Sequence, residues 1–135
     1  MEQIFDIPSP QAMHDFGRGL AKTHKIILLE GELGAGKTTL SKGFADELGI
    51  NPEQVQSPTY AYLNIYDNKL LHLDMYRLES FEQMIEKGIL DQMNDYEYIL
   101  IERPKRIENL EFWNYAEVRI EKIWDTQRRV SLTAK

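Results

Sequence analysis

The spacing of apolar residues changes along the chain between the period of a helix and the period of a strand. Apolar side chains at positions 12, 13, 16 and 20 share one helical face, and Ser9 followed by Pro10 is a typical helix start. We therefore predict a helix that begins after Ser9, its N-cap, and ends at about residue 22. Apolar runs predict strands over residues 4–7, 25–29, 98–102, 116–123 and 128–134.

The middle of the chain adds helices and a turn. A second helix is predicted from Lys37 to about Leu48, because Gly49 follows it. Two strand-like runs flank residues 67–69 (Asp-Asn-Lys), which is a hairpin signal, and the last two strands are predicted to form a second hairpin. Residues 81–95 are typical of one or two short helices broken at Gly88. Together, these helices and strands predict an α/β fold with a mixed parallel and antiparallel sheet flanked by helices.

Length and composition limit the class of protein. With 135 residues we expect a single domain spanning 1–135. The formal net charge of −6 argues against unspecific binding to nucleic acid or anionic lipid, and the absence of cysteine excludes thiolate chemistry. The N-terminus lacks the pattern of a signal peptide, and no apolar run approaches the about 18 residues that span a membrane. We expect a soluble, cytoplasmic protein.

The segment "GELGAGKTTL" carries the candidate chemistry. Gly31, Gly36, Lys37 and Thr38 satisfy G-x-x-x-x-G-K-[ST] between an apolar strand and a helix, which indicates a P-loop NTPase-like domain. Glycines let backbone N–H groups surround phosphates, the lysine reaches the β- and γ-phosphates, and the threonine hydroxyl is placed to ligate Mg²⁺. The predicted nucleotide-binding positions here are Gly31, Leu33, Gly34, Ala35, Gly36, Lys37, Thr38 and Thr39.

The choice between ATP and GTP is predicted from the absence of the motifs that GTPases carry. A GTPase normally carries N-K-x-D and D-x-x-G motifs, and the sequence has neither at the expected places, so ATP is favoured over GTP. A small-molecule kinase needs a lid and an acceptor segment. Residues 75–97 have room for an acceptor helix, but no arginine-rich lid is visible in the sequence.

Two strands that we expect to be buried end in an acid, at Asp74 and at Glu102. In P-loop enzymes an acid at this position holds Mg²⁺ directly or through water, or orients the attacking water. The sequence does not rank the two acids, so both are candidate metal ligands with Thr38. The candidate catalytic residues are Lys37, Asp74 and Glu102.

Several nearby residues have two interpretations. His72 either supports the sheet through a hydrogen bond, or supports Asp74 or a switch contact from the same strand face. Thr59 lies where switch loops occur and is a candidate sensor of the γ-phosphate, or it belongs to an ordinary turn. Tyrosines at 60, 62 and 66 alternate along one strand, either packed in the sheet or exposed to a partner.

Four stretches, "GELGAGKTTL", "SPTYAYLNIY", "LLHLDMYRL" and "LIERPKRI", stand in an order and at spacings that resemble the TsaE (YjeE) family. These proteins are the bacterial ATPases of tRNA threonylcarbamoyladenosine biosynthesis. The resemblance covers nearly the whole chain, and "HLDMYRL" after "SPTY" is its most specific part.

The resemblance implies a small, weak ATPase that binds ATP and Mg²⁺ and acts with the TsaD–TsaB pair, which modifies tRNA beside the anticodon. ATP hydrolysis would reset that complex between turnovers, and tRNA would be contacted indirectly. It gives Lys37 and Thr38 the P-loop roles, Asp74 the role of the Walker-B-like acid, and Glu102 that of the carboxylate near Mg²⁺. Thr59 would be the switch threonine.

One segment departs from the family pattern. Where the family usually has Glu-Trp-Pro-Glu, this chain has Glu102-Arg103-Pro104-Lys105, so the tryptophan and the second acid are replaced by cations. Arg103 is therefore either a built-in phosphate contact or part of a tolerant surface loop. With Arg106 and the pair 128–129, these cations are a candidate basic patch, or a solvated face.

Two rival functions stay open at this point. A small-molecule phosphotransferase would need an acceptor pocket. A nucleotide-gated binding module without turnover is the other, and the Arg103 substitution is the feature that favours it.

Overall fold

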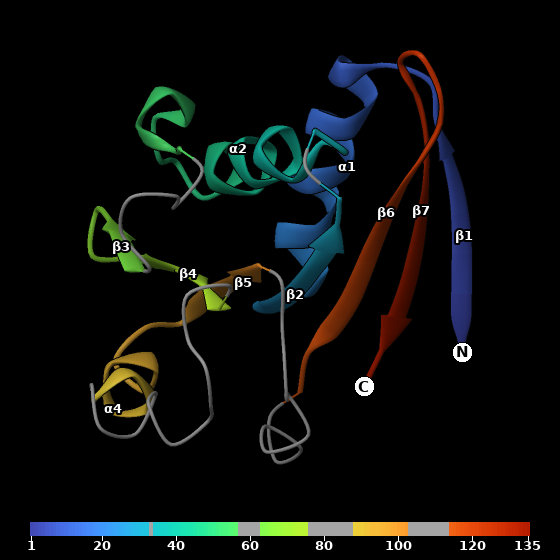
Figure 1. The fold of residues 1–135 in the computed structure, drawn as a ribbon. Coiled ribbons are helices and arrows are strands. Elements are labelled where there is room, and N and C mark those ends of the chain that lie inside the picture. The colour runs from blue at the N-terminus through green and yellow to red at the C-terminus, as the bar shows by residue number, and fades with distance from the viewer. Residues whose placement is uncertain (33, 57–62, 76–87, 103–113) are drawn as a thin grey trace.

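The protein, described here by a computed structural model, is built on one seven-stranded sheet with the order β1-β7-β6-β2-β5-β4-β3 (Figure 1). The structure describes residues 1–32, 34–56, 63–75, 88–102 and 114–135. The strands are β1 (Glu2–Ile7), β2 (Ile26–Gly31), β3 (Leu63–Tyr66), β4 (Leu70–Asp74), β5 (Tyr98–Glu102), β6 (Ala116–Trp124) and β7 (Gln127–Ala134). The helices are α1 (Pro10–Thr23), α2 (Lys37–Glu47), the 3-10 turn η1 (Pro52–Gln54) and α4 (Ile89–Met93).

The centre of the sheet is parallel and its margins are antiparallel. β2 pairs in parallel with both β5 and β6, and β4 pairs in parallel with β5. β3 is antiparallel to β4, β7 to β6, and β1 to β7. The predicted mixed sheet is confirmed, and so are both predicted hairpins. The first one turns through Asp67 and Asn68, which both have positive φ.

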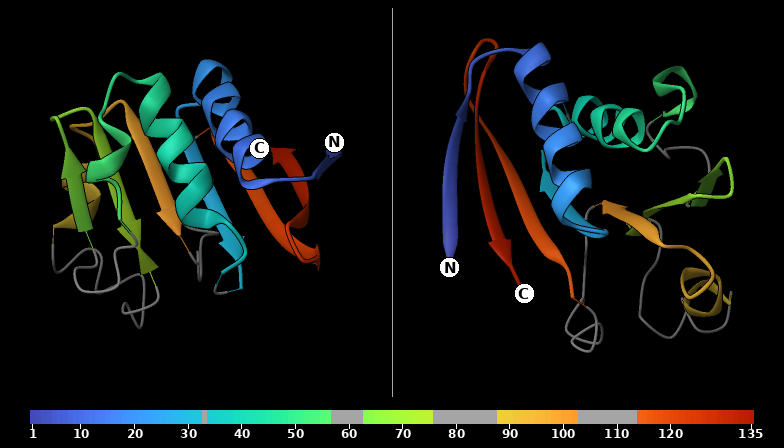
Figure 2. Two further views of the ribbon diagram at one scale, coloured as in Figure 1. Left: turned by 90° about the horizontal axis from the view of Figure 1, so that it is seen from above. Right: turned by 180° about the vertical axis from the view of Figure 1, so that it is seen from behind.

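Helices α1 and α2 lie side by side on one face of the sheet, and α4 lies on the other (Figures 1 and 2). The two helices approach closely at two glycines. A Cβ at Gly17 would lie 2.1 Å from the carbonyl oxygen of Leu40, and one at Gly43 would lie 1.9 Å from that of His14. Because no larger side chain fits there, these glycines set the distance between α1 and α2.

Helix α1 begins as predicted. The side chain of Ser9 accepts a hydrogen bond of 3.1 Å from the N–H of Ala12, and Pro10 is the first helical residue. Helix α2 ends at Glu47, one residue before the predicted end, and Gly49 follows with φ 82°. Gly88 has φ 69° and directly precedes α4, so the predicted helix after Gly88 is confirmed, while residues 81–87 before it lie outside the described residues.

Each face of the sheet has its own core. The larger core lies under α1 and α2, and the smaller one lies under α4; all five residues of β4 are buried between them. In β4, residues 70, 72 and 74 face α2, whereas residues 71 and 73 face α4. Within the described residues, no helix is long and apolar enough to cross a membrane.

Two expectations about side chains are settled. Tyr66 is buried, so for this tyrosine sheet packing is confirmed, while tyrosines 60 and 62 lie outside the described residues. Of the two alternatives for Arg128 and Arg129, a shared basic patch is not supported, because neighbouring residues of a strand point to opposite faces of the sheet. Arg128 bonds to the carbonyl of Ala35, and Arg129 lies 3.7 Å from Asp6.

Candidate functional site

The P-loop joins the end of β2 to the first turn of α2, as its sequence predicts. Gly34 has φ 80° and Gly36, the N-cap of α2, has φ 121°, a backbone region that favours glycine. A Cβ on Gly36 would also lie 3.2 Å from Cε of Met13 in α1. The N-cap residue Gly36 has no side chain to cap α2, and the N–H groups of the first turn are directed at the loop. The loop therefore fits an anion.

Lys37 is buried within this loop, with 7% of its surface exposed. Its Nζ donates a hydrogen bond to the carbonyl oxygen of Gly31, where the loop begins. The ammonium group thus lies inside the turn that would surround a phosphate. Thr38 and Thr39 follow in the first turn of α2 and are half-buried.

The two candidate acids are direct neighbours across the sheet. Asp74 and Glu102 are paired in register at the C-terminal ends of the parallel strands β4 and β5. Both are buried, with 4% and 2% of their surface exposed, and both lie on the face that carries α2. Because β5 is also paired in parallel with β2, the C-terminal ends of these strands lie together. The two acids are therefore at the same end of the sheet as the P-loop, which follows β2.

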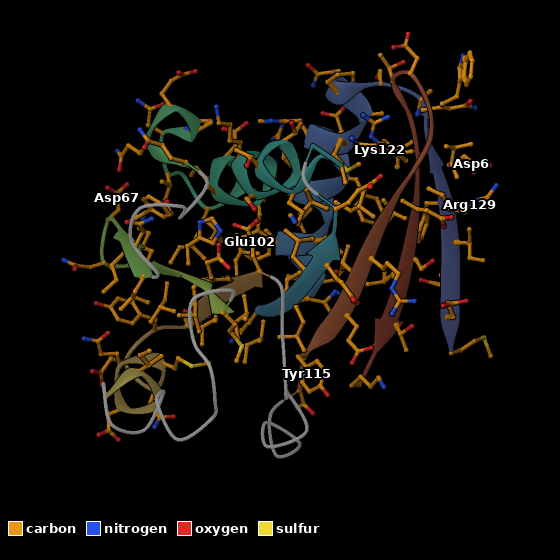
Figure 3. The ribbon with its side chains drawn as sticks, in the orientation of Figure 1. Asp6, Asp67, Glu102, Tyr115, Lys122 and Arg129 are labelled. Atoms are coloured by element: carbon orange, nitrogen blue, oxygen red, sulfur yellow. The ribbon has the colours of Figure 1, made fainter. Side chains whose placement is uncertain are left out.

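His72 is held by Glu102. Its Nε2 lies 2.5 Å from Oε2 of Glu102, and both side chains are buried (Figure 3 labels Glu102). Its Nδ1 lies 3.4 Å from the hydroxyl of Tyr66. The interpretation in which His72 supports the sheet through a hydrogen bond is therefore confirmed, and its partner is a carboxylate on the neighbouring strand.

The Tyr66 hydroxyl has a perturbed acidity. Burial raises the pKa of Tyr66, and the negative charge of Glu102 raises it further. Hydrogen bonds from the backbone of Gln56 and the side chain of Asn64 act in the opposite direction on this pKa. The phenol is therefore kept neutral and available as a hydrogen-bond donor beside His72.

The β6–β7 hairpin reaches the P-loop from the other side. Nε of Arg128 donates a hydrogen bond of 2.9 Å to the carbonyl of Ala35. Its Nη1 donates to the carbonyl oxygens of Trp124, Asp125 and Gln127 in the turn. One guanidinium group thus joins the hairpin turn to the P-loop.

A hollow of about 140 Å³ opens between α1, the P-loop and this hairpin. Its walls include Ser9 and Met13 from the start of α1, Thr39 from α2, and Thr126 from the turn. The sequence indicated the P-loop part of this wall, but not the contributions of Ser9, Met13 and Thr126, which come from segments distant from the P-loop.

The described residues contain no cluster of three histidine, aspartate or glutamate side chains able to hold an ion by themselves. Mg²⁺ in nucleotide sites needs fewer protein ligands, because waters and phosphate oxygens complete its octahedron. The Thr38 hydroxyl together with Asp74 and Glu102 offers hard oxygen donors of the required kind, so these residues fit Mg²⁺ bound with a nucleotide.

Some predicted site residues lie outside the described part of the chain. They are Leu33 of the P-loop, Thr59 of the candidate switch, and the departing segment Arg103, Pro104, Lys105 and Arg106. Their predicted roles remain predictions.

Comparisons with known proteins place the chain. The family model described as "Threonylcarbamoyl adenosine biosynthesis protein TsaE" matches residues 7–130. The tRNA threonylcarbamoyladenosine biosynthesis protein TsaE of Bacillus subtilis is 34% identical over 117 residues, which are 84% of this chain and 72% of the relative. The protein of the same name from Borreliella burgdorferi is 41% identical over 109 residues, which are 76% of this chain and 78% of the relative.

A solved structure has the same fold. The crystal structure of Bacillus subtilis YdiB superposes with a TM-score of 0.69 at 24% identity, covering 99% of this chain and 86% of that one. This likeness confirms the predicted P-loop-like fold. Together with the match of the family model over most of the chain, it leads to one conclusion: the chain belongs to the TsaE family of threonylcarbamoyl adenosine biosynthesis proteins.

Proposed function

We propose that this protein is a Mg²⁺-dependent ATPase, weak by itself, that acts with the TsaD–TsaB pair in tRNA threonylcarbamoyladenosine biosynthesis. One observation carries the proposal. A helix start with two positive-φ glycines, Gly34 and the N-cap Gly36, lies at the same end of the parallel strands as the paired acids Asp74 and Glu102. This is the arrangement that phosphoryl transfer from a nucleotide requires.

The loop would bind the phosphates. Backbone N–H groups of residues 34–39 would surround the β-phosphate, and the ammonium group of Lys37 would exchange its bond to the Gly31 carbonyl for bonds to β- and γ-oxygens. The Thr38 hydroxyl is placed to hold Mg²⁺. When bound, that ion would neutralise charge that develops on the phosphate oxygens.

The acids would complete the site with divided roles. Glu102 has one oxygen held by His72, so its carboxylate has a fixed orientation, which suits a metal-holding group. Asp74, beside it in register, then suits the contact with metal-bound water or with the attacking water. Neither acid reaches solvent freely, so charge placed here acts in a low dielectric.

The hollow beside the P-loop would receive the base and ribose. It is continuous with Gly34, Ala35 and Gly36, and its Met13 wall is apolar, as a purine face requires. The hydroxyls of Ser9 and Thr126 and the turn backbone offer hydrogen-bonding groups at its rim. We propose ATP as the ligand, in line with the missing guanine-reading motif.

Family membership supports the proposal that this protein acts with TsaD and TsaB. The net charge of −6 does not suit direct binding of tRNA, so TsaD and TsaB would hold the tRNA and this chain would contact it indirectly. ATP hydrolysis would then reset the complex between turnovers.

The deciding experiment is ATP hydrolysis by the purified protein, alone and with the TsaD–TsaB pair. We expect a negligible rate alone and a clear increase with the pair, abolished when Mg²⁺ is chelated. A rate indifferent to the pair but increased by a small metabolite would instead favour a phosphotransferase. Tight ATP binding without turnover under any condition would favour a nucleotide-gated binding module.

A further inference from the structure

A lysine of the C-terminal hairpin lies against the P-loop. A Cβ built on Gly34 would be 3.2 Å from Nζ of Lys122 and 3.6 Å from its Cε. The end of this side chain therefore occupies the space directly over Gly34, the loop residue with φ 80°. Figure 3 shows Lys122 on the side of β6 that faces the P-loop.

The backbone of the hairpin directs this lysine. Lys122 pairs across the strands with Arg128, and the register shifts between Lys122 and Trp124, so Ile123 is an extra residue on β6. Such a bulge turns the neighbouring side chains and increases the local twist. Arg128, on the paired strand β7, bonds to the Ala35 carbonyl and so links the hairpin that carries Lys122 to the loop.

In the part of the chain that the structure describes, Nζ of Lys122 makes no ion pair or hydrogen bond. This is so although Lys122 lines a second hollow, on the β6 side of the P-loop, together with Glu32 and Glu121. The nearby Glu30, by contrast, is paired with Arg119 at 3.2 Å. An exposed ammonium group beside an anion cradle, without a partner of its own, is available to a ligand.

We propose that Lys122 is a second cation of the nucleotide site, directed at the phosphate chain from outside the P-loop and positioned by Arg128. It rests on the proposed ATP binding at this loop. Lys37 acts from inside the turn, whereas Lys122 acts across Gly34 from the neighbouring strand β6. Two cations on opposite sides of the loop offset the phosphate charge more fully than one.

The test is the affinity for ADP and for ATP, measured by calorimetry on the full chain at low and at moderate salt. Lys122→Gln should weaken both nucleotides roughly three- to tenfold, with a smaller dependence on salt than in the unchanged protein. Lys122→Arg should restore most of the affinity because it keeps the charge. Lys22→Gln is the matched control, since Lys22 is an exposed lysine in the last turn of α1, at the opposite end of that helix from the loop.

Three outcomes separate the possibilities. An unchanged affinity of Lys122→Gln for both nucleotides overturns the inference while leaving the proposed function intact. An equal loss of nucleotide affinity in Lys122→Gln and Lys122→Arg also overturns it, because the positive charge would then not be the feature that contributes to binding. No binding of ADP or ATP by the unchanged protein would refute the proposed function itself.

Discussion

Oε2 of Glu102 lies 2.5 Å from Nε2 of His72, and neither side chain has more than 2% of its surface exposed. The strands β4 and β5 thus share a buried polar contact next to the predicted metal position. A carboxylate buried in this way needs a partner, since an unpaired buried charge is costly. The contact therefore belongs both to the stability of the sheet and to the orientation of the candidate metal ligand.

Replacing His72 by leucine should destabilise the protein strongly. The Glu102 carboxylate would lose its partner in the core, at a cost of about 3 kcal/mol in the free energy of unfolding. Urea denaturation measures this change. The double variant His72→Leu with Glu102→Leu should recover part of the loss, because no charge is then left buried; additive losses in the two positions would contradict the proposed pairing.

Replacing Lys37 by alanine should remove nucleotide binding with the fold unchanged. Its ammonium group is the charge inside the loop, so ATP affinity should fall at least roughly tenfold. Calorimetric titration gives the affinity, and circular dichroism checks the fold. Lys42→Ala, a change on the same helix α2 beyond its first turn, should bind ATP normally. Normal ATP affinity of Lys37→Ala would refute the P-loop assignment.

Alanine at Gly17 should separate helices α1 and α2. The new Cβ would lie 2.1 Å from the Leu40 carbonyl oxygen, so one helix must shift, at a cost of about 2–3 kcal/mol. Gly19 lies in the same helix with no heavy atom within 4 Å of its built Cβ. Gly19→Ala should therefore stabilise by about 0.5–1 kcal/mol. Similar melting temperatures for both variants would show that the close approach is not maintained in solution.

Stability at alkaline pH should depend on Tyr66. Its pKa is raised in the folded protein, first by burial and then by Glu102, so the folded state retains the phenol proton longer than the unfolded state. The resulting stability is complete below the ordinary tyrosine pKa of about 10 and is lost as the pH rises through the raised value. Urea midpoints at about pH 8 and about pH 11 should differ less in Tyr66→Phe than in the unchanged protein. An identical decline in both proteins would assign the pH dependence to other groups.

Arg128 and Arg129 offer a comparison of neighbours in one strand. Arg128 bonds to Ala35 and to carbonyls of the hairpin turn, so Arg128→Ala should lower the free energy of unfolding by about 1–3 kcal/mol and speed amide exchange in the turn. Among the described residues, the contact that Arg129 makes is an exposed one of 3.7 Å with Asp6, so Arg129→Ala should change stability by less than about 0.5 kcal/mol. Equal effects of the two changes would mean that the link between hairpin and P-loop contributes nothing.

The parts of the fold that follow from local chemistry could be predicted from the sequence. Ser9 and Pro10 start a helix, and Asp67 and Asn68 tolerate the positive φ of a tight turn, whatever the rest of the chain does. The P-loop likewise depends on adjacent residues. For this reason the described strands, the described helices and the glycine-rich turn agree closely with the prediction, whereas the predicted elements within residues 57–62 and 76–87 lie outside the described part of the chain.

The contacts between distant segments could not be predicted in this way. His72 and Glu102 are 30 positions apart, and Arg128 and Ala35 are 93 positions apart. Which of them meet depends on the order β6-β2-β5-β4 in the sheet, and one sequence contains no local signal for that order. The sequence therefore identified both acids and named His72 as a supporting residue, but it did not identify Glu102 as the partner of His72 or the contact of the hairpin with the P-loop.

The pairing of the outermost strands has a practical consequence. Glu2 lies opposite Thr133, and Ala134 lies opposite Ala116, which is level with Ile27 at the start of β2 rather than with the P-loop at its end. Both ends of the chain therefore lie near each other, as Figure 1 marks. They lie at the end of the strands that is opposite to the P-loop. An affinity tag or fluorophore fused to either end would leave the loop unobstructed. A short linker joining the two ends would allow a circular permutant opened elsewhere, for example in the Asp67–Asn68 turn.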